Sequence, residues 1–123
     1  MVRVLAAASA AVLVLSACGG GGTSATTAPA TASAAPVAAD VTVQGFKFGP
    51  QALEVKAGTK VTWTNKDTAG HTTTSGKPGA KDGKWEGQLA SSSGTFSFTF
   101  AQPGTFDYFC SIHNTMTGSV VVK

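Results

Sequence analysis

The segment Thr95-Phe-Ser-Phe-Thr-Phe100 decides the fold class, because its three phenylalanines alternate strictly with hydroxyl-bearing residues. A period of two residues places the rings on one face of a β-strand and the hydroxyl groups on the other. Shorter alternating segments recur on both sides of it, separated by turns that contain glycine, proline or asparagine. No ten-residue segment has helical periodicity. The sequence therefore predicts an all-β fold, a Greek-key antiparallel β-sandwich or barrel.

The same pattern predicts strands at 41–48, 53–55, 61–65, 72–74, 105–110 and 119–123. In the first of these the alternation changes phase near Gly45, where a bulge is expected. Ser75–Ala90 has four glycines and one proline and is predicted to be a loop. Trp85 in this loop is expected to cap the core, with docking to a partner as the alternative. All ten aromatic residues fall within 40–123, so this part of the chain can build a core.

The amino-terminal residues have the pattern of an export signal. Met1-Val-Arg3 gives a short basic start, and Val4–Leu15 is an apolar run too short to span a bilayer. The run leads into Leu15-Ser-Ala-Cys18, which resembles the lipobox of bacterial lipoproteins. That resemblance implies that residues 1–17 are a signal peptide and that Cys18 is lipidated; the alternative is an ordinary signal peptide. Because two acyl chains anchor durably, we expect an exported, membrane-anchored lipoprotein that faces the periplasm or the extracellular side.

A low-complexity segment follows the lipobox. Gly19–Ala39 contains no aromatic, charged or long aliphatic side chain. Such a composition cannot bury enough apolar surface to offset the entropy of ordering. It predicts a flexible tether with an r.m.s. span of about 25 Å. The predicted organisation is therefore a signal peptide at 1–17, a lipidated cysteine and tether at 18–39, and a folded domain at 40–123.

Charge says little about partners. The chain has nine basic and six acidic residues, and no stripe of Lys and Arg with interleaved aromatics that would indicate nucleic-acid binding. Lys77, Lys81 and Lys84 cluster in the predicted loop. We expect this loop to be solvated, with a docking patch for an acidic partner as the alternative. We also expect a monomer.

The residues that carry chemistry follow one predicted strand. Phe106, Tyr108 and Cys110 share a face of it, so a strand whose aromatic rings point into the core also directs the thiol inward. His113 and Met116 follow with Cys-x₂-His-x₂-Met spacing. Cys110 is the only thiol that remains once Cys18 is lipidated. An unpaired thiol in an oxidising compartment is a liability unless it is buried or ligated.

His71 is the only other histidine. A Greek-key sandwich can place its loop at the same end of the domain as the Cys110–Met116 loop. Two histidines, one cysteine and a weak methionine are the ligand set of an electron-transfer copper site. Thiolate and thioether favour Cu(I), and imidazole also suits Cu(II). These residues therefore indicate one copper ion that alternates between Cu(I) and Cu(II).

Two stretches carry a family resemblance, Val61–Ser75 with its histidine at 71, and Gly104–Gly118 with the Cys–His–Met loop. Over 40–123 the chain resembles the cupredoxins, nearest the single-domain plastocyanin and amicyanin group. The resemblance implies a type 1 (blue) copper site. It also implies that an electron donor and an electron acceptor dock at an apolar patch near His113. In that site His71 would be the upstream ligand, Cys110 the thiolate, His113 the solvent-edge ligand and Met116 the axial ligand.

The chain departs from many relatives beside its ligands. Gly70 and Thr72 flank His71 where Pro and Asn are frequent, and Asn114 follows His113 where Pro is frequent. The ligands themselves are intact. Because hydrogen bonds around the ligands tune a metal site, these differences bear on the reduction potential and not on the ligand set.

The leading interpretation is an electron carrier without enzymatic activity. The alternative is a copper-delivery lipoprotein, but such a protein usually exposes extra Met or His ligands, and the mature chain has only Met116 and two histidines. An enzyme would need an open metal position or a base oriented by a carboxylate, and neither is evident. Structural zinc rarely recruits methionine. A metal-free adhesion sandwich would leave Cys110 and both histidines unexplained.

Overall fold

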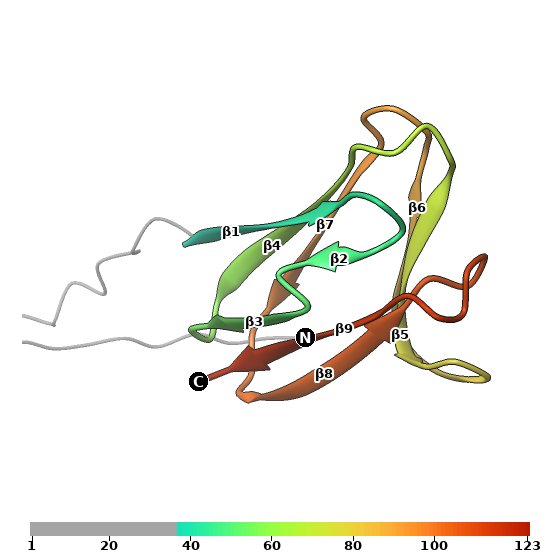
Figure 1. Ribbon diagram of the computed structural model, residues 1–123. Helices are drawn as coiled ribbons and strands as arrows, with labels where there is room; N and C mark the ends of the chain where they lie inside the picture. The colour runs from blue at the N-terminus through green and yellow to red at the C-terminus, as the bar shows by residue number, and fades with distance from the viewer. Residues whose placement is uncertain (1–36) are drawn as a thin grey trace, which may run out of the picture. The chain divides into compact units, whose positions relative to one another are not determined.

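The computed structural model describes residues 37–123, which form two β-sheets packed face to face (Figure 1). One sheet has the strand order β2-β1-β4-β7 and the other the order β3-β9-β8-β5-β6. Cys18, the signal sequence and nearly all of the predicted tether lie outside the described residues. The strands are β1 (Ala38–Val43), β2 (Phe48–Gly49), β3 (Ala52–Val55), β4 (Thr59–Asn65), β5 (His71–Lys77), β6 (Ala80–Leu89), β7 (Thr95–Phe100), β8 (Gly104–Phe109) and β9 (Thr117–Val122).

The predicted all-β sandwich is confirmed, and its sheets are mixed. β1 pairs with β4 in parallel, and β3 pairs with β9 in parallel. The other pairs, among them β4–β7, β5–β6 and β8–β9, are antiparallel. β7 has the expected alternation of exposed and partly buried residues, ending at the buried Phe100. β1 begins at Ala38, three residues before the first strand predicted from sequence.

The prediction of a loop over Ser75–Ala90 is wrong. β5 continues to Lys77, and Ala80–Leu89 forms the ten-residue strand β6, which pairs with it as a hairpin. Trp85, Gly87 and Leu89 alternate with exposed residues, so the second half of this strand has a buried face. The four glycines that favoured a loop lie within the two strands of this hairpin or in the turn between them. A Cβ on Gly87 would lie 2.2 Å from the Phe96 ring, so the absence of a side chain there makes room for that ring.

The single strand predicted at 41–48 is interrupted. β1 ends at Val43 and β2 begins at Phe48, and a turn closed by the Gln44 N to Lys47 O hydrogen bond joins them. In place of a bulge, Gly45 and Phe46 both adopt left-handed backbone angles, with φ of 61° and 59°. Phe46 therefore leaves the core and is half exposed.

Aromatic side chains from both sheets fill the core. Trp63 of β4 stacks on Trp85 of β6 at a ring distance of 6.0 Å and meets Tyr108 of β8 edge-on at 5.4 Å. All three are buried, so the expectation that Trp85 caps the core is confirmed. Cys110 and Met116 belong to the same buried cluster. The loop that carries Cys110 and Met116 is therefore anchored in the buried core of the domain.

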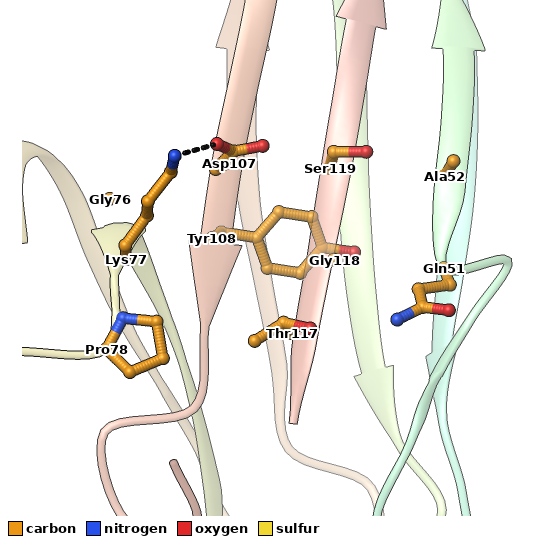
Figure 2. Close-up of a pocket in the computed structure, with 10 residues that line it drawn as sticks. All are labelled: Gln51, Ala52, Gly76, Lys77, Pro78, Asp107, Tyr108, Thr117, Gly118 and Ser119. Atoms are coloured by element: carbon orange, nitrogen blue, oxygen red, sulfur yellow. Dashed lines mark ion pairs between the residues drawn. The ribbon is translucent and has the colours of Figure 1, made fainter. Parts of the chain in front are cut away.

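Tyr108 fits its place because the residue opposite it has no side chain. Its ring lies across Gly118 of β9 (Figure 2), where an added Cβ would come within 2.4 Å of the ring. The Tyr108 side chain is buried, and its hydroxyl has no hydrogen-bond partner among the described residues. Burial disfavours the charged phenolate and raises the pKa of Tyr108 to about 12.

Within residues 37–123 there is no helix long and apolar enough to cross a membrane.

Tyr108 is the one tyrosine in the chain, so its ionisation can be followed without interference from other phenols. In the folded protein at pH 11 we expect about a tenth of it to be ionised, against about nine tenths for an exposed tyrosine. The unfolded chain loses this proton first. The free energy of unfolding should therefore fall by up to about 1.4 kcal/mol per pH unit between pH 10 and the folded pKa of about 12. Absorbance near 295 nm, recorded with and without denaturant, measures both; half-ionisation of the folded protein near pH 10 would contradict the burial.

Candidate metal centre

The side chains singled out by sequence meet at one end of the sandwich. Cys110, His113 and Met116 lie in the loop that joins β8 to β9, and His71 is the first residue of β5. Figure 1 shows the β8–β9 loop projecting beyond the strands on the same side as the β1–β2 turn. β8 and β5 are neighbours in the five-stranded sheet, which brings His71 to the start of this loop.

The loop that carries three of the residues is closed by its own backbone. Cys110 N donates to Met116 O at 3.0 Å, and Met116 N donates to His113 O at 2.9 Å. The Cys110 side chain is fully buried, as the alternation of β8 predicts, and Met116 is 3% exposed. These bonds hold a seven-residue loop against the core, so its ligand groups have little freedom to move apart.

Three donor atoms converge within this loop and β5. Cys110 Sγ lies 3.9 Å from His71 Nδ1 and 3.8 Å from His113 Nδ1. The two Nδ1 atoms are 3.2 Å apart. Within residues 37–123, no other three His, Cys, Asp or Glu side chains come so close together. The convergence of His71, Cys110 and His113 predicted from sequence is confirmed, and Met116 is buried in the same loop.

Asp67 sets which nitrogen of His71 faces this cluster. Its Oδ2 lies 3.0 Å from His71 Nε2. The same carboxylate accepts hydrogen bonds from the backbone N–H groups of Gly45 at 2.7 Å and Phe46 at 2.9 Å. The bonds from Phe46 and Gly45, followed by the contact with His71, lower the pKa of Asp67. An ionised carboxylate only accepts, so Nε2–H donates to Asp67 and Nδ1 is the nitrogen that faces the cluster.

Thr72 joins the two ligand segments. Its backbone N–H donates to Cys110 Sγ at 3.3 Å, and its hydroxyl accepts from the backbone N–H of Ser111 at 2.7 Å. The hydroxyl also lies within hydrogen-bond distance of the Ser111 and Thr74 hydroxyls. Thr72 thus holds β5 against the residue that follows Cys110. Sequence reasoning gave it no such role.

Asn65 organises the loop that leads to His71. It is fully buried at the end of β4. Its side-chain amide donates to Ala69 O at 2.8 Å and Ala90 O at 3.0 Å, and its carbonyl oxygen accepts from Asp67 N at 2.9 Å. The spacing Asn-x-Asp-x₃-His was the available sequence signal, but it does not show which atoms the carboxylate would reach.

Phe46 covers the cluster from the outside. Its ring meets His71 edge-on at 5.2 Å and His113 edge-on at 5.0 Å. It is 51% exposed, and Ile112, next to His113 in the sequence, is 57% exposed. Apolar side chains therefore flank the one ligand ring that is only partly buried. Phe46 was expected in a strand, and its contact with the histidines was missed.

The donor set fits a copper ion. Separations of 3.2 to 3.9 Å are those produced by three ligands at about 2.0–2.3 Å from one ion, the usual range for thiolate and imidazole. Two imidazole lone pairs and a sulfur facing each other repel unless a cation or proton lies among them. Thiolate and thioether donors are soft, and with imidazole they select copper. His71, Cys110, His113 and Met116 would hold it.

A hollow on the described surface lies away from these residues. It lies beside β3, β8 and β9 and has a volume of about 450 Å³ (Figure 2). None of the four ligand residues lines it. The ion pair that borders it joins Lys77 and Asp107 at 3.7 Å, and their side chains are 75% and 44% exposed. Asp107 thus faces outward as expected, and the hollow has no group placed for catalysis.

Comparison with known proteins agrees with the geometry. A family model described as copper binding proteins, plastocyanin/azurin family, matches residues 35–123. Amicyanin-alpha of Methylorubrum extorquens is 40% identical over 86 residues, which cover 68% of this chain and 71% of that protein. Amicyanin of Paracoccus denitrificans is 32% identical over 94 residues, covering 76% and 72%.

Solved structures are similar over the same region. A reduced amicyanin mutant matches with a TM-score of 0.63 and 30% identity, covering 75% of this chain and 88% of the other. A purple cupredoxin from Nitrosopumilus maritimus matches with a TM-score of 0.63 and 27% identity, covering 69% and 99%. The family model spans the whole described domain. The chain therefore belongs to the plastocyanin/azurin family of copper-binding proteins, as an amicyanin-like member.

Proposed function

We propose that this protein is a lipid-anchored, amicyanin-like electron carrier that exchanges single electrons with redox proteins in the cell envelope. The observation that carries the proposal is the convergence of Cys110 Sγ, His71 Nδ1 and His113 Nδ1 in a braced, largely buried cluster. Bound copper supplies a one-electron Cu(I)/Cu(II) couple. The residues around it hold the ligands in one arrangement, which suits a function in which only charge changes.

The hydrogen bonds and burial that hold the ligand residues in place favour electron transfer over chemistry on a substrate. Cys110 and His71 are 0% and 1% exposed, so no open ligand position faces the solvent on their side. Backbone bonds close the loop from Cys110 to Met116, and Thr72 ties it to β5. Ligands fixed in this way move little when the charge of the site changes. Met116 adds a thioether, a soft and weak ligand that both oxidation states tolerate.

Partner docking is proposed at the surface around His113. Ile112 and Phe46 expose apolar area beside its ring. The loop from Cys110 to Met116 contains no charged residue. A donor or acceptor with an apolar contact surface would bring its own redox centre close to the His113 ring without having to desolvate charges. The protein would act as a monomer, using the same patch for each partner in turn.

The lysines of the β5–β6 hairpin are a weaker candidate for docking. Lys77 pairs with Asp107, Lys81 with Glu86 and Lys84 with Asp82. Each cation thus has a carboxylate beside it, which reduces the positive field available to an acidic partner. Exposed pairs of this kind contribute little to stability. These lysines are therefore better explained as solvent-exposed charges than as a docking patch. They lie in a β-hairpin and not in the loop that the sequence predicted.

Copper delivery is the alternative function. A delivery protein must surrender its metal, which is easiest through exposed, exchangeable ligands. Cys110 and Met116 are buried, and the mature sequence offers no other methionine or histidine besides His71 and His113. The burial of these ligands and the lack of further Met or His residues favour retention of the metal.

The location proposed is the outer face of a membrane. The basic start, the apolar run and the Leu15-Ser-Ala-Cys18 sequence support an exported lipoprotein. The compositionally simple segment after Cys18 would let the copper domain reach partners near the membrane surface.

Retention of copper during turnover separates the two functions. Copper-loaded protein should keep its metal through repeated cycles of reduction and oxidation in the presence of a Cu(I) chelator, because the buried soft ligands hold both states. Cys110→Ser, which removes the thiolate, serves as the control that releases copper. Chelator absorbance and protein-bound copper are measured after each cycle. Loss of the metal from the wild-type protein on first reduction would favour delivery.

Cys18→Ser tests the anchor. The wild-type protein expressed in a bacterial host should sediment with membranes and incorporate radiolabelled fatty acid. The variant should lose the label and appear in the soluble envelope or medium fraction. Ser16→Thr, which leaves the cysteine in place, is the matched control. Membrane association and labelling that are unchanged by Cys18→Ser would contradict the proposal.

A further inference from the structure

We propose that Asp67 is a positioning residue that joins the Phe46 turn to the His71 ring, so that one carboxylate sets both the ligand and its aromatic cover. The inference deepens the copper site described above and rests on it. It is carried by three hydrogen bonds to one side chain and by the unusual backbone that two of them stabilise.

Two of the bonds come from a backbone concavity. Gly45 and Phe46 have successive left-handed conformations, with φ of 61° and 59°. Consecutive N–H groups in such a turn point to one side and form an anion-binding nest. The anion here is Asp67, whose Oδ1 and Oδ2 accept at 2.7 and 2.9 Å from a turn more than twenty residues earlier in the chain. The β1–β2 turn is thereby attached to the β4–β5 loop.

The backbone of Phe46 is a costly conformation that the bonds to Asp67 help to stabilise. A large side chain rarely adopts a positive φ, and doing so costs about 1–3 kcal/mol unless its surroundings compensate. Its ring is half exposed, so burial in the core does not account for the conformation. The Gln44 N to Lys47 O bond closes the turn, and the two charge-assisted bonds to Asp67 add to it by satisfying the N–H groups of Gly45 and Phe46.

The third bond fixes the ligand. Asp67 Oδ2 lies 3.0 Å from His71 Nε2, and the Asp67 side chain is only 14% exposed. The bond orients the ring and places its proton on Nε2, leaving Nδ1 directed at Cys110 Sγ. The ligand-ready form of His71 is thus established by the protein before metal arrives.

The Phe46 ring connects the two functions of the carboxylate. Held by the nest, it lies edge-on to both His71 and His113 and covers them from solvent. Without Asp67, Phe46 would relax to a negative φ and its ring would leave the histidines. Loss of one carboxylate should therefore free the His71 tautomer and uncover His113 together.

The first test uses copper-free protein. In the wild type, ¹⁵N chemical shifts of His71 should report a single tautomer protonated at Nε2. In Asp67→Ala the ring should show a mixture of tautomers, and Asp67→Asn, which keeps the side-chain volume, provides a second variant if alanine impairs folding. Glu54→Gln, which removes an exposed carboxylate paired with Lys123, controls for the change in charge. An unchanged single tautomer in both Asp67 variants would overturn the proposal.

The second test measures coupling between the carboxylate and the ring it holds. Asp67→Ala should speed copper loss to a chelator by about 10- to 100-fold, the effect expected for a partner of a metal ligand. Phe46→Gly should give a smaller increase, because only the cover is lost. The double variant should release copper at the rate of Asp67→Ala alone, since that substitution already displaces the ring. Rates that multiply would show that Asp67 does not hold Phe46, and would overturn this part of the proposal.

Discussion

The structure depends on keeping three electron-rich atoms close together. Cys110 Sγ and the Nδ1 atoms of His71 and His113 lie 3.2–3.9 Å apart, an arrangement that an unconstrained chain would avoid. The fold maintains this arrangement because Cys110 is buried in the aromatic core and because backbone hydrogen bonds close the loop that follows it. Thr72 and Asp67 then fix the second ligand segment from two sides. Binding of a cation relieves the repulsion, so metal affinity and fold stability are linked.

The same constraint explains why a sandwich suits this chemistry. β5 and β8 are neighbours, so the two ligand segments start from adjacent, hydrogen-bonded strands. Trp63 and Tyr108 pack edge-on in the core cluster that also contains Cys110. A close-packed interior resists the displacement of side chains. Rigidity at the base of the site and an apolar exposed edge at His113 together provide what electron exchange requires, namely fixed ligands and a short approach for a partner.

Sequence reasoning recovered the ligands because their chemistry is carried by residue type and spacing, and it recovered most strands because alternation reports a buried face. β6 was missed because four glycines in 75–90 outweighed the Trp85–Gly87–Leu89 alternation, and only pairing with β5 shows that those glycines fit an extended hairpin. The position of Phe46 was missed for a different reason. Its backbone N–H donates to Asp67, 21 residues away, and no local pattern predicts such a bond.

The central claim is that Cys110 and the two histidines form one preassembled copper site. One equivalent of Cu(II) added to the purified protein, followed by visible absorption spectroscopy, tests it most directly. The account predicts an intense band from thiolate-to-copper charge transfer that forms without a slow refolding phase and bleaches reversibly with a mild reductant. A pale solution with only weak d–d absorption would show that Cys110 is not a ligand, and would contradict the account.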